Sequence, residues 1–214
     1  MTGAGTSGWR DAVLDALAWV LPVECVACGA PDRMLCGSCR QHLAGEPIAV
    51  VAGGLDVVAA APYAGTVQRV LLALKNGHTP LASALAPLLR TVLAEAPPGV
   101  ELAAVPSTRA AIRRRGYDPL LVVLGRADVR PARVLRPARA HRAQKELGRA
   151  ERHENLRGVH RARRPLHGRR FVLVDDVVTT GATLAEAARA IREAGGEVVG
   201  AVAIAATPRI RHPE

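Results

Sequence analysis

Runs of consecutive apolar residues alternate along this chain with segments whose apolar residues recur every three or four positions. The apolar runs predict strands buried on both faces, over residues 55–61, 102–105, 171–174 and 197–205. The recurring positions predict amphipathic helices over residues 66–75, 81–96, 118–126 and 184–194. Because strands that alternate with helices form parallel sheets with right-handed crossovers, we expect an α/β fold in which helices flank a parallel sheet.

Other parts of the chain fit this alternation less well. Residues 129–135 have the composition of a strand, but Pro131 weakens that prediction because proline donates no hydrogen bond to a sheet. Residues 136–170 have no sustained apolar period and are predicted to form a long mobile connection. The stretch from Trp9 to Leu21 carries charges among its apolar residues, which predicts a short amphipathic helix rather than an export signal.

The cysteines are concentrated near the start of the chain, as the pairs Cys25–Cys28 and Cys36–Cys39. Two Cys-x-x-Cys pairs can bring four thiolates to one tetrahedral zinc ion, which leaves no open coordination position. We therefore expect a structural Zn²⁺ site in an N-terminal module, residues 1–45, with His42 outside the ligand set. Two disulfides or four free thiols are the alternatives, although a cytosolic chain disfavours disulfides.

The most distinctive stretch of the sequence follows the apolar run 171–174. Two adjacent carboxylates, Asp175 and Asp176, precede a short loop of small residues and the start of a helix. The first amides of a helix lack intrahelical partners and lie at the positive end of its dipole, so they bind phosphate groups. Ionised carboxylates accept hydrogen bonds from hydroxyl groups. This order of groups predicts a sugar-phosphate site beyond the carboxyl end of the strand.

This stretch resembles the phosphoribosyl pyrophosphate (PRPP) motif of type I phosphoribosyltransferases. The resemblance implies that Asp175 and Asp176 contact the ribose hydroxyls of PRPP and serve as the catalytic pair. It also implies a cradle for the 5-phosphate, made by Thr179, Thr180, Gly181, Ala182 and Thr183. Mg²⁺ accompanies PRPP in that family and is therefore an expected cofactor. The corresponding domain is expected to cover residues 55–206.

Further matches extend the resemblance over most of the chain. With the cysteine pairs in front, Arg115-Gly116-Tyr117-Asp118 and later residues resemble the ComF family of phosphoribosyltransferase-like proteins, which is associated with DNA uptake in natural competence. The resemblance implies a pyrophosphate-binding loop at Ser107, Thr108 and Arg109. It also implies a flexible basic loop that closes over PRPP, with the candidates Gln144, Lys145, Arg149 and Arg152. For any single arginine of that loop, a solvated surface charge is the alternative.

Two positions of the sequence add to this picture. The family usually has Phe-Asn where this chain has Tyr117-Asp118, so the aspartate adds a negative charge and removes an amide donor. Lys75 follows an apolar helix and matches a lysine position of the family, with a helix C-terminal cap as the alternative.

Charge is distributed unevenly over the 214 residues. Residues 101–170 hold 19 Lys or Arg and 6 Asp or Glu, a net charge of +13, whereas the whole chain carries +10. A basic segment of this kind suits phosphates, pyrophosphate or nucleic acid. Its only aromatic residue is Tyr117, and single-strand binders usually offer several aromatic rings for stacking. No apolar run reaches the ~18 residues of a membrane span, and we expect a cytoplasmic protein.

Two functions remain open at this point. The resemblance favours an enzyme that binds PRPP and transfers its phosphoribose to an unidentified nucleobase-type acceptor, with release of pyrophosphate. The alternative is a non-catalytic accessory protein that binds a nucleotide or single-stranded DNA, with competence or recombination proteins as partners. A zinc-finger DNA reader is disfavoured, because four cysteines so close together leave little room for a recognition helix.

Overall fold

The computed structural model describes residues 23–138 and 158–207, and its centre is a five-stranded sheet with the strand order β1-β2-β7-β6-β3. The strands are β1 (Ile48–Ala52), β2 (Leu55–Pro62), β3 (Glu101–Ala104), β6 (Arg170–Val178) and β7 (Glu197–Ala206). The last four are mutually parallel, and β1 pairs antiparallel with β2 at one edge. The prediction of an α/β fold with a mainly parallel sheet is confirmed.

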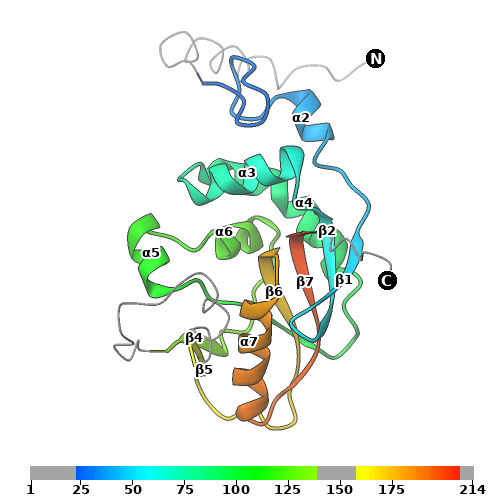
Figure 1. The fold of residues 1–214 in the computed structure, drawn as a ribbon, viewed down its shortest axis with the longest axis vertical. Coiled ribbons are helices and arrows are strands. Elements are labelled where there is room, and N and C mark those ends of the chain that lie inside the picture. Colours follow the sequence, from blue (N-terminus) through cyan, green and yellow to red (C-terminus); the bar gives the residue numbers. More distant parts are fainter. Residues whose placement is uncertain (1–22, 139–157, 208–214) are drawn as a thin grey trace, which may run out of the picture.

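Helices cover both faces of this sheet (Figure 1). One face is covered by α3 (Gly65–Lys75), α4 (Ala82–Leu93) and α6 (Pro119–Arg126). The other face is covered by α7 (Ala182–Glu193). The remaining elements are α2 (Gly37–Gln41), the 3₁₀ helix η1 (Thr79–Leu81), α5 (Arg109–Arg115), and the two-stranded sheet of β4 (Leu135–Pro137) and β5 (His160–Ala162).

The apolar run of β6 explains why this strand is central. Phe171 and Leu173 are buried against α7, whereas Val172 and Val174 join the cluster beneath α3, α4 and α6. Side chains of a strand alternate between the two faces of a sheet, so a strand covered on both sides needs an unbroken apolar run. The two hydrophobic clusters therefore hold β6 from both sides and fix the place where its carboxyl end opens into solvent.

Several sequence predictions need correction. No strand was predicted before residue 55, yet β1 lies there as an edge strand whose outward positions are exposed. The strand predicted over residues 129–135 is wrong, because β4 begins only at Leu135. Before β4, Ala132 lies outside any strand, although its amide donates to the carbonyl of Leu102 in β3 (2.7 Å). Helix α5 was not predicted, since none of its residues is buried and it carries no apolar stripe.

The connection predicted over residues 136–170 contains the small sheet β4–β5 within its described part. The helix predicted from Trp9 to Leu21 lies outside the described residues. Within the described ranges, no helix is both long and apolar enough to cross a membrane.

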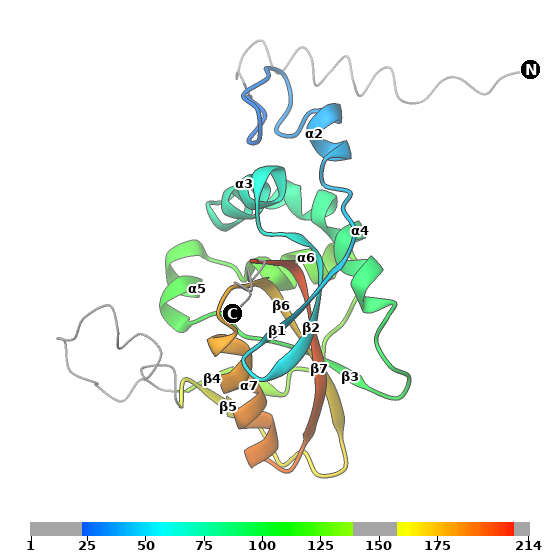
Figure 2. The ribbon, with the colours of Figure 1, turned by 45° about the vertical axis from the view of Figure 1, so that its right-hand side comes forward.

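The cysteine module packs onto the helical face of the sheet that carries α3. Cys25, Leu35, Cys39 and Leu43 are buried in the same hydrophobic cluster as the α3 side chains. Figure 2 shows α2 beside α3, at the end of the molecule away from β4 and β5. The module thus shares a hydrophobic core with the helix whose last residue is Lys75.

Candidate functional site

The acid pair lies near the carboxyl end of β6, as the sequence predicted, but inside the strand rather than after it. Asp175 is still paired with Ala203 of β7, and the ladder continues to Val178. The loop that follows is only three residues long, and α7 begins at Ala182. The carboxylates and the helix N-terminus are therefore held on one rigid strand–loop–helix unit.

A cavity of about 210 Å³ brings these groups together with residues from other elements. Five of the predicted site residues line it, namely Ser107, Thr108, Asp175, Asp176 and Thr183. Three basic residues outside the predicted set also line it, namely Lys75, Arg115 and His160.

The other predicted residues stand apart from the cavity wall. Arg109 is exposed as the first residue of α5 and does not line the cavity. Thr179, Thr180, Gly181 and Ala182 form the adjacent loop and helix start, outside the lining of the cavity. Gln144, Lys145, Arg149 and Arg152 lie outside the described residues, so their roles stay predictions.

The two aspartates have different surroundings. The Nζ atom of Lys75 lies 2.9 Å from Oδ2 of Asp176, so this carboxylate has a cationic partner. Asp175 accepts a hydrogen bond from the Asp176 amide (2.8 Å). Burial raises the pKa of Asp175 well above its usual value, and the adjacent Asp176 carboxylate raises it further. The cavity therefore contains a carboxylate that favours a proton, a hydroxyl donor or a cation beside it.

The loop before α7 has the backbone that an anion cradle needs. Gly181 is the N-cap of α7 in the left-handed conformation (φ 80°), and the first turn of α7 contains no acidic residue. The Ala182 amide lies 3.4 Å from the Thr180 hydroxyl oxygen. A Cβ atom on Gly181 would lie 2.3 Å from the Gly53 nitrogen, so the β1–β2 turn backs this loop directly. Position 181 therefore requires glycine for conformation and for space.

The loop after β3 is held by side chains from the segment that follows it. The Ser107 amide donates to Oδ2 of Asp118 (3.1 Å), whose Oδ1 accepts the Leu120 amide (3.1 Å) at the start of α6. Tyr117 donates its hydroxyl hydrogen to the Leu74 carbonyl and accepts the Gly77 amide (3.0 Å). Tyr117 and Asp118, which depart from the ComF pattern, therefore both make structural contacts. Asp118 also serves as the N-cap of α6.

A buried polar network joins the cavity to α7. His160, 2% exposed, lines the cavity, and its backbone amide donates to the buried Glu186 carboxylate (3.2 Å). Arg189 donates to both oxygens of Glu186 and to the His160 carbonyl. Burial lowers the pKa of His160 and outweighs the opposite effect of Glu186, so its ring is neutral at pH 7. No local sequence pattern marks this histidine within its arginine-rich segment.

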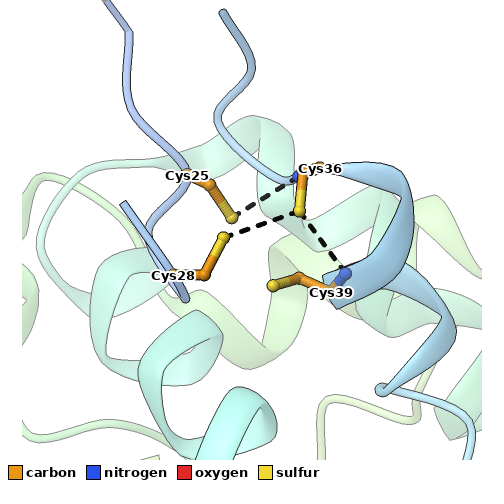
Figure 3. A group of neighbouring side chains, drawn as sticks. All are labelled: Cys25, Cys28, Cys36 and Cys39. Carbon is orange, nitrogen blue, oxygen red and sulfur yellow. Dashed lines mark hydrogen bonds between the residues drawn. The ribbon is translucent and has the colours of Figure 1, made fainter. Parts of the chain in front are cut away.

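The four cysteines form a separate candidate metal centre (Figure 3). Their sulfur atoms all lie within 4.8 Å of one another, and all four residues are free of disulfides. The sulfurs of Cys28 and Cys36 are 3.7 Å apart, close to the ~3.8 Å that Zn–S bonds of ~2.3 Å give in a tetrahedron. The donor set and its spacing fit zinc.

The electrostatics of the cluster also favour a cation. A hydrogen bond from the Ser38 hydroxyl is the largest cause that lowers the pKa of Cys36 to about 6. The hydrogen bond with Cys36 is the largest cause that raises the pKa of Cys39 to about 12. Without a metal, ionisation of one thiol thus opposes ionisation of its neighbour. His42 bonds the Ser38 carbonyl through Nδ1 (2.7 Å), away from the ligand set.

Comparisons with known proteins agree with this arrangement. A family model described as phosphoribosyl transferase domain matches residues 63–214. The chain is 30% identical over 199 residues to the DNA utilization protein YhgH of Escherichia coli O157:H7, covering 85% of this chain and 88% of that protein. The DNA utilization protein YhgH of strain K12 is 31% identical over 190 residues, covering 82% and 80% of the two chains.

A shorter likeness is to a phosphoribosyltransferase. Over 39 residues, 18% of this chain and 21% of the relative, the sequence is 59% identical to orotate phosphoribosyltransferase of Methanopyrus kandleri. The family model and the long alignments together cover the sheet, the acid pair and the loop before α7. The chain therefore belongs to the phosphoribosyl transferase domain family, as a member of its ComF-type group.

Proposed function

We propose that the protein binds PRPP together with Mg²⁺ in the 210 Å³ cavity and transfers the phosphoribosyl group to a nucleobase-type acceptor. One observation carries this proposal. The cavity joins the Asp175–Asp176 pair at the end of β6 to Ser107 and Thr108 after β3, with the N-terminus of α7 beside it. Twin carboxylates, an anion cradle and a second polar loop are the groups that a phosphorylated ribose with a pyrophosphate substituent requires.

The proposed orientation of PRPP follows from the positions of these groups. The 5-phosphate lies on the amides of residues 179–183, where the dipole of α7 and the hydroxyl groups favour negative charge. The ribose diol donates to Asp175 and Asp176. The pyrophosphate lies toward Ser107 and Thr108, which line the cavity just after β3, the strand that pairs with β6.

In the proposed reaction, an acceptor nitrogen forms a bond to C1 of the ribose while the bond from C1 to the pyrophosphate oxygen breaks. The pyrophosphate leaves with the electron pair, and the acceptor nitrogen gives up its proton. The transition state carries positive charge on the ribose, which the acid pair favours. Lys75 holds Asp176 through their 2.9 Å ion pair, so the carboxylate keeps its position as the charge develops.

Metal ions fit this proposal in two roles. The oxygen donors of Asp175 and Asp176 suit Mg²⁺, which supplies charge neutralisation for the pyrophosphate when it accompanies PRPP. The four cysteines suit one Zn²⁺, and a site with four protein ligands is structural. The zinc is therefore proposed to stabilise the module rather than to take part in transfer.

The acid pair provides the direct test of PRPP binding. In the variant Asp175→Asn with Asp176→Asn, we expect PRPP affinity in the presence of Mg²⁺ to fall at least 100-fold, since both carboxyl groups are lost. Isothermal titration calorimetry measures this, with the exposed Asp56→Asn as the control for removal of surface charge. Equal PRPP affinity in wild type and double variant would refute the assignment.

Pyrophosphate release tests catalysis separately. Wild-type protein with PRPP and Mg²⁺ is screened against a panel of nucleobases, beside the acid-pair variant. Release that depends on one base and is lost in the variant supports the transferase.

A second function is favoured by a different observation. Relatives that align along most of the chain are named DNA utilization proteins, and residues 101–170 carry a net charge of +13. Arg113 and Arg114 of α5 are exposed. These features support a cytoplasmic accessory role in which the protein binds single-stranded DNA beside competence or recombination proteins. Binding that weakens steeply with salt, without release of pyrophosphate on any base, would favour this role over the transferase.

A further inference from the structure

One cation that lines the cavity has no counter-ion among the described residues. Lys75 and Arg115 are the two permanently charged cations among the described residues that line it. Lys75 is paired with Asp176, whereas Arg115 forms no ion pair with any residue of the described ranges. Charged groups that are withdrawn from water are normally paired, so an unpaired guanidinium in a cavity indicates an anionic ligand.

Hydrogen bonding points in the same direction. Across the described residues, only two buried side-chain nitrogens have no hydrogen-bond partner, Nε of Arg115 and Nδ1 of His160, and both residues line this cavity. The Nε of arginine can only donate, so its missing partner is an acceptor. An acceptor beside a guanidinium is most stable when it carries negative charge, as phosphate oxygens do.

One hydrogen bond of its own and the contacts of its neighbours hold Arg115 in position. Its Nη2 atom donates to the Ser107 hydroxyl (3.3 Å), which belongs to the loop expected to hold pyrophosphate. Ser107 is held in turn by Asp118, and Tyr117 ties the same turn to the end of α3. Gly116, in the left-handed conformation (φ 80°), ends α5 directly after Arg115. The guanidinium is therefore oriented before any ligand arrives.

We propose that Arg115, and not Arg109, is the side chain that binds the pyrophosphate group, with Asp118 positioning it through Ser107. This inference rests on the proposed function, because it names a contact within the same cavity. Arg109 lies six residues earlier on the same helix but is exposed and outside the cavity lining. Substitution of Arg109 therefore serves as the control for substitution of Arg115, because each change removes one positive charge from α5.

The experiment compares Arg115→Gln with Arg109→Gln by calorimetric titration with PRPP, inorganic pyrophosphate and ribose 5-phosphate, each with Mg²⁺. We expect Arg115→Gln to weaken PRPP and pyrophosphate about 10- to 100-fold, the effect of a lost charge-assisted hydrogen bond. Ribose 5-phosphate affinity should stay unchanged, because that ligand does not reach Arg115. Arg109→Gln should change none of the three by more than about 2-fold, as screened surface charges do.

Arg115→Lys keeps the positive charge but loses the planar guanidinium, so we expect an intermediate loss of affinity for PRPP and pyrophosphate. This variant replaces Arg115→Gln if the glutamine variant fails to fold. Equal PRPP affinity in wild type and Arg115→Gln, or an equal loss of ribose 5-phosphate, would overturn the inference. Pyrophosphate binding that depends on Arg115 while PRPP does not bind would uphold the inference and reject the proposed function. A wild-type protein that binds neither ligand would reject both.

Discussion

Asp175 combines a position in the proposed ribose site with a cost in stability. The carboxyl is withdrawn from water and lies next to Asp176, and both effects raise its pKa in the folded state. In the unfolded chain the pKa is near its ordinary value of ~3.9. The folded protein therefore holds this proton more tightly than the unfolded chain does. The contribution of this proton to the stability of the folded protein is fully present below the unfolded pKa. It is lost as the pH rises through the folded pKa.

Asp175→Asn should therefore stabilise the protein while it abolishes ligand binding. We expect similar Tm values for variant and wild type at about pH 4, and a higher Tm for the variant at about pH 8, by ~2–4 °C for each kcal/mol regained. Thermal unfolding across this range measures the difference. A difference that is independent of pH, or a variant that is less stable at about pH 8, would show that the folded-state pKa is not raised.

At the scale of elements, α7 performs two tasks. Its N-terminus borders the proposed phosphate cradle, and its middle holds β5 through Glu186. Burial raises the pKa of Glu186, but hydrogen bonds from Arg189 and the His160 amide outweigh it, so the pKa lies below the usual value. The carboxylate is thus ionised and serves as the common acceptor for a side chain of α7 and a backbone amide of β5. This contact fixes His160 against the cavity.

Loss of the buried Glu186 carboxylate should lower the free energy of unfolding far more than loss of the exposed Glu193 carboxylate. Arg189 pairs with the buried Glu186 and also with Glu193, whose side chain is 66% exposed. We expect Glu186→Ala to lower the free energy of unfolding by about 2–3 kcal/mol, because an arginine and an amide lose a buried acceptor. Glu193→Ala should cost less than about 0.5 kcal/mol. Urea denaturation measures both, and equal costs would contradict the role of burial.

The elements that could be predicted from sequence are those whose signal is local. An unbroken apolar run identifies β6, and two adjacent acids before a small-residue loop identify the proposed ribose site. β1 escaped prediction because it is a short edge strand with exposed outward positions. Arg115 and His160 escaped because tertiary contacts bring them to the cavity, from a helix without buried residues and from a strand of three residues. Arg115 belongs to the motif that carries the family resemblance, but the resemblance implied no role for this side chain, and no neighbouring pattern marks His160.

At the scale of the whole molecule, the cysteine module and the cavity are connected through α3. Leu35 and Leu43 of the module are buried in the same cluster as Val70 and Leu74 of α3. The last residue of α3 is Lys75, which holds Asp176 in the cavity. An ion that orders the cysteines therefore stabilises a helix that reaches the proposed ribose site. The proposed zinc would therefore act on ligand binding without any contact with the ligand.

Removal of the proposed zinc should accordingly affect stability first and binding second. We expect one zinc per chain by elemental analysis in wild type and in His42→Ala, and loss of the metal in Cys36→Ser. Loss of several kcal/mol of metal binding should lower the Tm by on the order of 10 °C and weaken PRPP binding several-fold, since α3 loses its packing partner. Circular dichroism should still report the sheet, because its core lies on both faces of β6 and β7. If the metal-free Cys36→Ser protein kept its Tm and its PRPP affinity, the cysteine site would have no effect on the cavity. The proposed connection through α3 would then be wrong.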